Sequence, residues 1–240
     1  MKKTLDLGKS DALIVVDVQI DFCPKGSLPV PEGDQIVPVL NDYIKLFTKS
    51  NAKIIATRDW HPQNHMSFKE YGGPWPPHCV QQSEGAKFHP NLKLPNTTTI
   101  ISKAMDSNKE SYSGFDDTNL ASELKAQGVD RVFVGGLATD YCVKSTVFDA
   151  LKLGFEVVLV LDATRGLNLT PGDVEKAIDE MTLNGAEINN LTDFPDDSVL
   201  PPEASVDLEI TDEKPIARAT VKKKARLRSR GPYRKIKAER

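Results

Sequence analysis

The sequence predicts a three-layer α/β/α sandwich with a mostly parallel sheet of about six strands. Short apolar runs rich in β-branched residues alternate with amphipathic segments, which is the pattern of repeated βαβ units. The length of 240 residues, with 39% hydrophobic and 27% charged residues, is that of a globular protein with one main domain. We therefore expect a central sheet covered by helices.

Five apolar runs are the candidates for strands. Each is short and nearly continuous, as expected of strands that are buried on both faces of a parallel sheet. In chain order they are residues 12–16 (ALIVV), 53–57 (KIIAT), 99–102 (TIIS), 131–135 (RVFVG) and 156–161 (EVVLVL). Parallel strands need crossover connections, and helices are the usual form of such connections.

Four segments place apolar residues at helical spacing and are predicted to be helices. They are residues 34–49, 118–127, 140–153 and 173–183. In the third of these, Val143, Val147 and Ala150 share one face, and Gly154 is a helix stop.

The domain is predicted to span residues 1–195, and residues 196–240 to form an acidic, proline-bearing linker and a basic tail. From Glu213 onward the chain has 12 of its 31 Lys and Arg but 2 of its 34 Asp and Glu. With few large apolar residues, this extension is expected to be solvated and mobile. A contact of the tail with nucleic acid or another polyanion is the weaker alternative.

The cysteines and the apolar runs bear on the compartment. Cys23, Cys79 and Cys142 make an odd count without paired spacing, so a disulfide framework is not expected. No run approaches the ~20 apolar residues that span a bilayer, and the N-terminus lacks the apolar stretch of a secretory signal. We expect a cytoplasmic protein without membrane contact.

The stretch RDWHPQNH holds two of the four histidines and suggests a metal site. Asp59 and His61 directly follow the run 53–57, His65 follows, and His78 comes after a proline-rich loop. Ligands bind at the carboxyl ends of strands in an open α/β sheet, and this donor set suits zinc, manganese or iron. A turn-capping aspartate and surface histidines are the alternative for any one of these residues taken alone.

Cys142 follows the run 131–135 and opens a predicted helix. With Thr139 as N-cap, the thiol lies in the first turn, where the helix dipole lowers a thiol pKa and free N–H groups can hold an oxyanion. A small buried apolar residue is the equally weighted alternative. Asp17 and Lys103 also follow apolar runs, so both should lie at the same sheet edge as Cys142.

Six motifs together resemble one known family. IVVDVQIDF, ATRDWHPQNH, WPPHCV, ISKA, SYSGF and GGLATDYCV occur in this order between about residues 12 and 191. The chain resembles the nicotinamidases of the isochorismatase-like cysteine hydrolases. The resemblance implies Cys142 as nucleophile, Asp17 as proton acceptor and Lys103 as stabilising cation. The family's metal ligands fall on the four positions already singled out, Asp59, His61, His65 and His78.

The resemblance also implies an oxyanion hole and a pocket. The backbone N–H groups of Ala138 and Cys142 match the oxyanion hole, with a cis peptide bond before Ala138. Phe22, Trp75 and Tyr112 match positions that enclose the pyridine ring, although Phe22 and Trp75 would equally suit core packing. One divalent metal ion, zinc first and manganese or iron as alternatives, is expected at the pyridine nitrogen.

The implied reaction converts nicotinamide to nicotinate and ammonia through a thioester, in an enzyme that we expect to be a homo-oligomer. The alternatives are a related small-amide hydrolase of the same fold, a metal-water hydrolase without a covalent step, and a non-catalytic binding protein. The cysteine at position 142 argues against an isochorismatase, which lacks this nucleophile.

Overall fold

The computed structural model describes residues 6–194. The predicted boundary at residue 195 and the predicted basic tail lie outside these residues. The described chain forms one sheet of six strands in the order β3-β2-β1-β4-β5-β6, with every neighbouring pair parallel. The strands are β1 (Asp11–Val16), β2 (Lys53–Asp59), β3 (Thr99–Lys103), β4 (Arg131–Leu137), β5 (Glu156–Arg165) and β6 (Glu187–Asn189).

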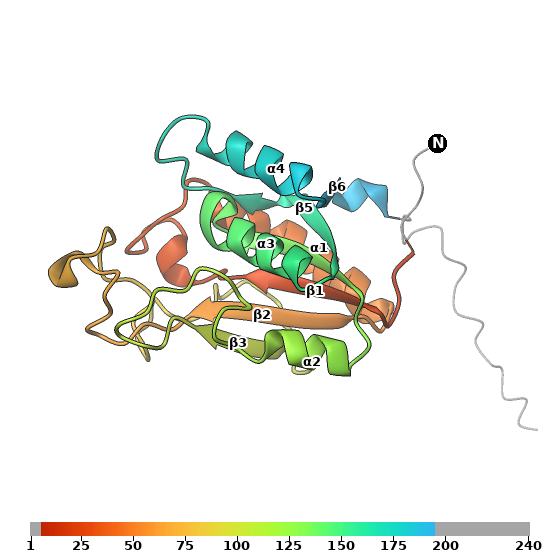
Figure 1. Ribbon diagram of the computed structural model, residues 1–240, viewed down its shortest axis with the longest axis horizontal. Helices are drawn as coiled ribbons and strands as arrows, with labels where there is room; N and C mark the ends of the chain where they lie inside the picture. The colour runs from red at the N-terminus through yellow and green to blue at the C-terminus, as the bar shows by residue number, and fades with distance from the viewer. Residues whose placement is uncertain (1–5, 195–240) are drawn as a thin grey trace, which may run out of the picture. The chain divides into compact units, whose positions relative to one another are not determined.

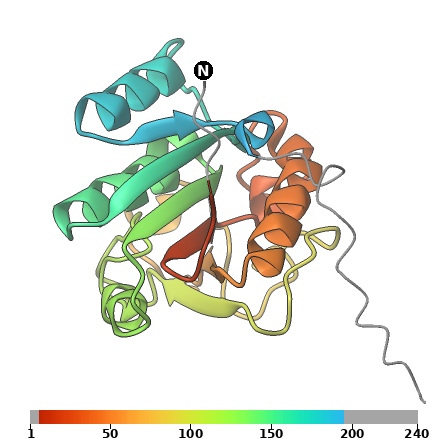
Figure 2. The ribbon, with the colours of Figure 1, turned by 90° about the vertical axis from the view of Figure 1, so that its right-hand side faces the viewer.

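Helices cover both faces of this sheet (Figures 1 and 2). One face packs against α1 (Ile36–Lys49), and the other packs against α2 (Leu120–Ala126), α3 (Lys144–Lys152) and α4 (Asp173–Leu183). The predicted three-layer parallel fold is confirmed. Among the described residues, no helix is both long and apolar enough to cross a bilayer.

The five predicted strands are all present, and β6 is the strand that the sequence did not reveal. It has only three residues, and two of them are exposed, so it lacks the apolar run that marks the others. It pairs with β5 through the register of Leu159 with Ile188.

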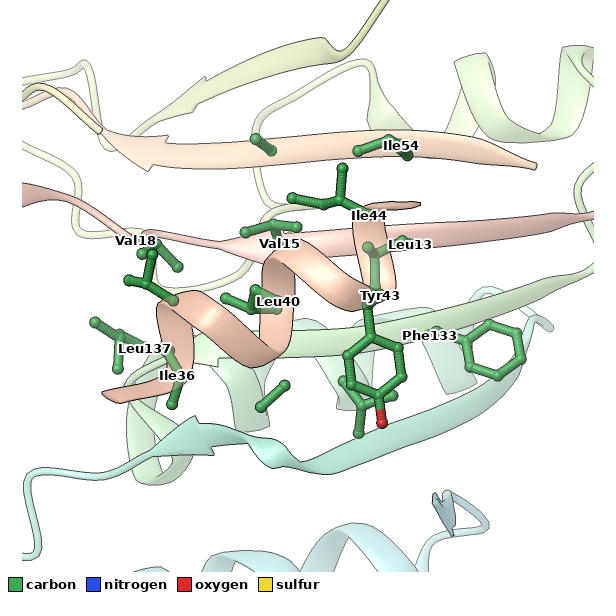
Figure 3. Close-up of a cluster of buried hydrophobic side chains, with 14 of the residues drawn as sticks. Leu13, Val15, Val18, Ile36, Leu40, Tyr43, Ile44, Ile54, Phe133 and Leu137 are labelled. Carbon is green, nitrogen blue, oxygen red and sulfur yellow. The ribbon is translucent and has the colours of Figure 1, made fainter. Parts of the chain in front are cut away.

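The core on the α1 side shows why this segment is a helix (Figure 3). Leu40, Tyr43 and Ile44 lie on one face of α1 and pack against the inward side chains of β1, including Leu13 and Val15. All five are buried. Replacing a buried leucine such as Leu40 by alanine costs about 2–5 kcal/mol of stability in well-packed cores.

The carboxyl ends of four adjacent strands lie side by side in the order β3-β2-β1-β4. Lys103 is the last residue of β3 and Asp59 is the last residue of β2. Asp17 follows β1 in the left-handed region, with a φ of 49°, and its N–H donates to the Thr57 carbonyl at 3.2 Å. Ala138 follows β4. Parallel pairing thus brings four chain-distant segments to one edge of the sheet.

Candidate active site

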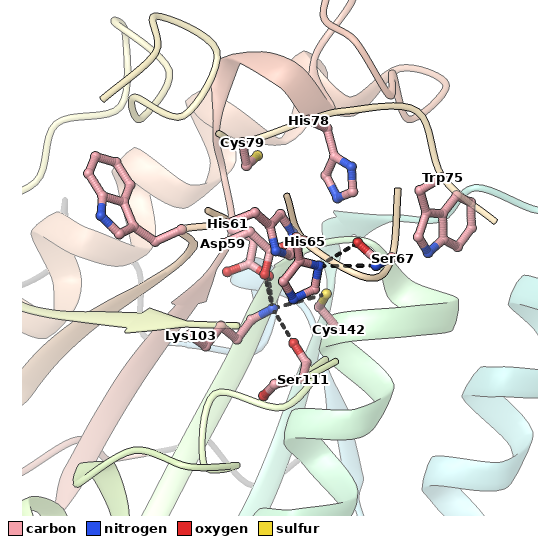
Figure 4. A network of polar contacts seen from close by, with 12 residues as sticks. Asp59, His61, His65, Ser67, Trp75, His78, Cys79, Lys103, Ser111 and Cys142 are labelled. Carbon is pink, nitrogen blue, oxygen red and sulfur yellow. Dashed lines mark hydrogen bonds and ion pairs between the residues drawn. The ribbon is translucent and has the colours of Figure 1, made fainter. Parts of the chain in front are cut away.

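A buried ammonium lies at the centre of this edge (Figure 4). The Lys103 Nζ atom lies 3.0 Å from Asp17 Oδ2, forms a short ion pair with Asp59 Oδ1, and donates to Cys142 Sγ at 3.4 Å and to the Ser111 carbonyl at 3.3 Å. Burial alone disfavours the charged amine, but Asp17 and Asp59 hold the pKa of Lys103 well above its ordinary value. Lys103 therefore remains an ammonium.

Asp17 and the Cys142 thiol both contact Lys103, and burial shifts the pKa of each. Burial raises the pKa of Asp17 although Lys103 opposes the shift, and the Thr57 hydroxyl donates to Asp17 Oδ1 at 2.7 Å. Burial likewise raises the pKa of the Cys142 thiol well above its ordinary value. The shift is opposite to the one predicted for a helix start, because desolvation of the buried sulfur outweighs the attraction of Lys103.

The turn that carries Cys142 begins one residue earlier than predicted. A single π-helical turn, Thr139–Val143, precedes α3, and Ala138 rather than Thr139 is its N-cap. The Thr139 hydroxyl is instead hydrogen-bonded to the Thr164 hydroxyl at 2.7 Å. The expected cis peptide bond between Leu137 and Ala138 is present.

Gly136 lets β4 pass close to the end of β1. Its φ is 125°, and a Cβ atom there would lie 2.1 Å from the Val16 carbonyl oxygen. No side chain fits in this space, so glycine at position 136 allows the two backbones to approach closely.

Beside this group, three of the four predicted metal ligands face one point. Single ligand atoms of Asp59, His61 and His78 all lie within 4.8 Å of one another, and the His61 and His78 ring centroids are 4.7 Å apart. His61 is buried, and neither of its ring nitrogens has a hydrogen-bond partner among the described residues. Orphaned buried nitrogens beside a carboxylate fit a bound cation.

His78, the second imidazole of this set, is held in the neutral form that can bind a metal ion. His78 Nδ1 lies 2.8 Å from the Pro76 carbonyl oxygen, which fixes the proton on Nδ1 and leaves Nε2 free. Burial lowers the pKa of His78 to about 4, so the imidazole is neutral, as metal ligation requires.

His65 differs from the other three. Its ring centroid lies 4.3 Å from that of His61, yet both of its nitrogens are engaged, Nδ1 with the Ser67 hydroxyl at 2.7 Å and Nε2 with the Lys109 carbonyl at 3.0 Å. The structure therefore brings the His65 ring to the cluster without offering a free ligand atom.

Asp59 belongs to both groups. Its Oδ1 pairs with Lys103, and its Oδ2 lies 3.6 Å from His61 Nε2. Burial opposes its ionisation, but Lys103 and His61 hold the pKa of Asp59 well below its ordinary value. Asp17, Asp59 and Cys142 also gather closely enough to hold an ion, but the Lys103 ammonium already lies among them.

Gln19 positions Asp59, and the sequence interpretation missed it. The buried Gln19 amide donates to the Asp59 carbonyl at 2.8 Å and accepts from the Asp59 N–H at 2.8 Å. After β1 has ended, this side chain therefore makes the hydrogen bonds to β2 that a strand backbone would make. Two residues later, Asp21 accepts the Cys79 N–H at 2.7 Å, next to His78. The only signal was a polar residue repeated two apart in the motif VVDVQIDF.

A cavity of about 30 Å³ joins the two groups to the predicted ring-binding residues. Phe22, Trp75 and Tyr112 line it together with Cys142 and His78. The Trp75 indole donates to the Tyr112 hydroxyl at 3.0 Å, so the two aromatic side chains hold each other in place.

Three further cavity residues were not predicted: Leu28, Tyr141 and Leu167. Tyr141 packs edge-on against Trp75, with ring centroids 5.2 Å apart. Its place beside Cys142 in the motif was a usable signal, whereas the two leucines lie in loops that carry none. A larger hollow of about 360 Å³ opens at the amino end of β2, near Lys53, away from these groups.

A parallel sheet whose carboxyl edge gathers a thiol, an ammonium and carboxylates has the groups that a cysteine-dependent hydrolase needs. The isochorismatase domain family matches residues 11–193. The chain belongs to the isochorismatase family, and its relatives there include nicotinamidases, which confirms the resemblance seen in the motifs.

Three relatives show how far the similarity extends. The nicotinamidase of Escherichia coli is 41% identical over 204 residues, which cover 76% of this chain and 96% of that protein. The pyrazinamidase of Pyrococcus horikoshii in complex with zinc is 54% identical, with a TM-score of 0.73 over 75% of this chain and 99% of that chain. PnC1 from L. infantum in complex with nicotinate is 36% identical, with a TM-score of 0.75 over 80% of this chain and 99% of that chain.

Proposed function

We propose that this chain is a nicotinamidase, a metal-dependent cysteine amidohydrolase that converts nicotinamide to nicotinate and ammonia through a thioester. The observation that carries the proposal is the buried contact of the Cys142 sulfur with the Lys103 ammonium, which also pairs with Asp17, at the wall of an aromatic cavity. The nicotinamidase of Escherichia coli and the nicotinate-bound L. infantum structure support the choice of substrate.

The three charged or ionisable groups take separate roles in this proposal. Asp17 is the proton acceptor, and its raised pKa makes it a stronger base than an exposed aspartate. Cys142 is the nucleophile, which is neutral at rest. Lys103 stays charged and stabilises the thiolate as it forms.

The reaction proceeds in two halves. Asp17 removes the Cys142 proton as the sulfur attacks the carboxamide carbon, and the N–H groups of Ala138 and Cys142 hold the developing oxyanion. Asp17 then gives this proton to the amide nitrogen, the C–N bond breaks, and ammonia leaves a thioester. A water molecule, deprotonated by Asp17, attacks the thioester. The C–S bond breaks, the proton returns to Cys142, and nicotinate is released.

Asp59, His61, His65 and His78 are the residues that would hold one divalent metal ion, with zinc first and manganese or iron as alternatives. When bound, the ion would supply Lewis-acid coordination to the pyridine nitrogen, which orients and polarises the ring. The zinc complex of the Pyrococcus horikoshii pyrazinamidase supports zinc. Both ring nitrogens of His65 are engaged in hydrogen bonds here, so His65 would have to give up one of these bonds to bind the ion.

Phe22, Trp75 and Tyr112 enclose the ring in this proposal. Phe22 and Trp75 are buried and present apolar surface to the cavity, while Tyr112 is half-buried. Burial raises the pKa of Tyr112 to about 12, so its hydroxyl stays protonated. This hydroxyl accepts a hydrogen bond from the Trp75 indole, and its own O–H can donate a hydrogen bond to the substrate.

The test is release of ammonia from nicotinamide by the zinc-loaded full chain, compared with Cys142→Ala and with Cys23→Ala as a matched buried-thiol control. We expect turnover by the wild type and by Cys23→Ala, and a loss of at least about 10⁴-fold in Cys142→Ala.

Each failure of this test has its own meaning. A wild type that releases no ammonia from nicotinamide contradicts the substrate. Turnover that persists in Cys142→Ala contradicts the covalent step and leaves a metal-water hydrolase as the better description.

A further inference from the structure

Asp140 and Leu167 lie at the active site without a role in the reaction above. Asp140 is buried two residues before Cys142, in the same helical turn. Leu167 is half-buried, follows β5, and lines the cavity that Cys142 also lines. The two residues lie 27 positions apart in the chain, and one hydrogen bond joins them.

Both oxygens of the Asp140 carboxylate are used by one loop. Oδ1 accepts the Leu167 N–H at 3.0 Å, and Oδ2 accepts the Asn168 N–H at 2.8 Å. Hydrogen bonds to an ionised acceptor are roughly twice as strong as neutral ones. Because Asp140 shares its turn with Cys142, the loop is fastened to the element that carries the sulfur.

The other side of the loop is fastened as well. The Asn168 side-chain oxygen accepts the Gly172 N–H at 3.2 Å and the Val174 N–H at 3.3 Å, at the start of α4. At Gly166 a Cβ atom would lie 2.2 Å from Val174 Cγ2 and 2.9 Å from Asp140 Oδ1. The loop therefore closes on Asp140 only because residue 166 has no side chain.

We propose that Leu167 limits the size of the ring that the site accepts, and that Asp140 is a positioning residue that holds Leu167 against the cavity. This inference rests on the proposed function, because it takes a pyridine carboxamide as the substrate. Leu167 lines the cavity together with the aromatic side chains, so its bulk bounds the space left for a ring. Among these side chains, Leu167 is an aliphatic side chain placed by a dedicated clamp.

The experiment compares kcat/KM for nicotinamide with kcat/KM for a nicotinamide that carries a methyl group on the ring. One methylene in an apolar pocket is worth about 10–200-fold in discrimination. Leu167→Ala should therefore lower the preference for nicotinamide by about 10-fold or more. Asp140→Asn should shift the preference in the same direction, and its KM for nicotinamide should rise about 10-fold with kcat nearly unchanged, as expected for losing one charge-assisted hydrogen bond.

Two further variants guard against a merely structural explanation. Asp162→Asn is the matched control, since this carboxylate accepts the Leu191 N–H at 2.8 Å and the Tyr43 hydroxyl at 2.8 Å away from the cavity, and it should keep wild-type preference. Gly166→Ala leaves the Asp140 charge intact but forces the loop off the carboxylate, and it should reproduce the shift of Asp140→Asn.

The opposite results would overturn the inference. An unchanged preference in Leu167→Ala removes Leu167 as the size limit. A fall in kcat at constant KM in Asp140→Asn assigns Asp140 to the nucleophile's turn instead of the cavity wall. Titrating both amides calorimetrically into Cys142→Ala measures the same preference as a ratio of Kd values. If the wild type releases no ammonia, only the proposed function is contradicted. The ratio of the two Kd values still tests whether Leu167 limits the size of the ring.

Discussion

Two groups of buried polar side chains meet at Asp59, and they differ in how far the protein satisfies them. Around Lys103 the buried ionic groups pair with one another, since the ammonium contacts Asp17, Asp59 and the Cys142 sulfur. Around His61 the contacts are fewer, because neither buried ring nitrogen has a hydrogen-bond partner among the described residues and Asp59 Oδ2 lies 3.6 Å from Nε2. The Lys103 group supplies its own counter-charges, whereas the His61 group (Asp59, His61 and His78) has the composition of a receptor for a cation.

This difference separates two tasks within one site. A complete ion cluster resists change and can hold a proton and a nucleophile in fixed places. A cluster of imidazoles and a carboxylate with unpaired ring nitrogens gains from a cation that those nitrogens can bind. The shared carboxylate of Asp59 fixes the distance between the two groups, so substrate held at one should meet the sulfur of the other.

The strongest test removes the proposed base, Asp17, from the Lys103 group. In Asp17→Asn the side chain keeps its shape but no longer accepts the Cys142 proton, and we expect kcat to fall by about 10³- to 10⁴-fold. Zinc stoichiometry, measured by elemental analysis, should stay at the wild-type value because Asp17 is outside the His61 group. Asp11→Asn, which alters a buried carboxylate paired with Arg131, should keep its activity. Loss of zinc together with activity would show that the two groups are not separable.

The second test removes the cation of the Lys103 group. Lys103→Met leaves Asp17 and Asp59 buried without their cation, and we expect a loss of about 3–5 kcal/mol in the free energy of unfolding measured in urea. Without Lys103 the pKa values of both carboxyls should rise in the folded state. The folded state then takes up protons as the pH falls, so the loss should be smaller at pH 5 than at pH 8. A loss independent of pH would mean that lost packing and not unpaired charge destabilises the variant.

The third test supplies a cation to the His61 group. Zinc at about 100 times its Kd should raise the free energy of unfolding of the wild type by about 2.7 kcal/mol, and a chelator should reverse the gain. His61→Ala should show little of this stabilisation. His89→Ala, which alters a half-buried histidine outside the group, should respond like the wild type. Equal stabilisation of both variants would place the metal elsewhere.

Much of this comparison follows from the sequence, because parallel pairing alone puts residues that follow buried strands at one edge. Asp17, Asp59 and Lys103 follow apolar runs directly, and the thiol follows a fourth, so their meeting was predictable. The fold was predictable for the same reason, except for β6, which has no apolar pattern.

Other features depend on the path of the chain between elements. The thiol pKa moves opposite to the prediction because burial, which no local pattern encodes, dominates it. His65 is engaged by Ser67 and Lys109, and the latter comes from a loop far along the chain. The role of Gln19 exists only because the backbone leaves β1 at Asp17, with its positive φ.

The smallest expected effect belongs to Gln19→Leu, which tests whether the His61 group is preformed. The leucine cannot pair with the Asp59 backbone, so the carboxylate should be less well placed for both groups. Losing a partner that orients a ligand typically costs about 10–100-fold in metal affinity. We expect a rise of that size in the Kd for zinc, measured by competition with a chelating dye. Asn41→Leu is the matched control, because the Asn41 amide also pairs with backbone, accepting the Lys93 N–H at 2.8 Å and donating to the Asn91 carbonyl at 2.9 Å on the surface. If Gln19→Leu binds zinc as tightly as Asn41→Leu, the loops and not the end of β1 position Asp59, and the two groups are then independent in structure as well as in chemistry.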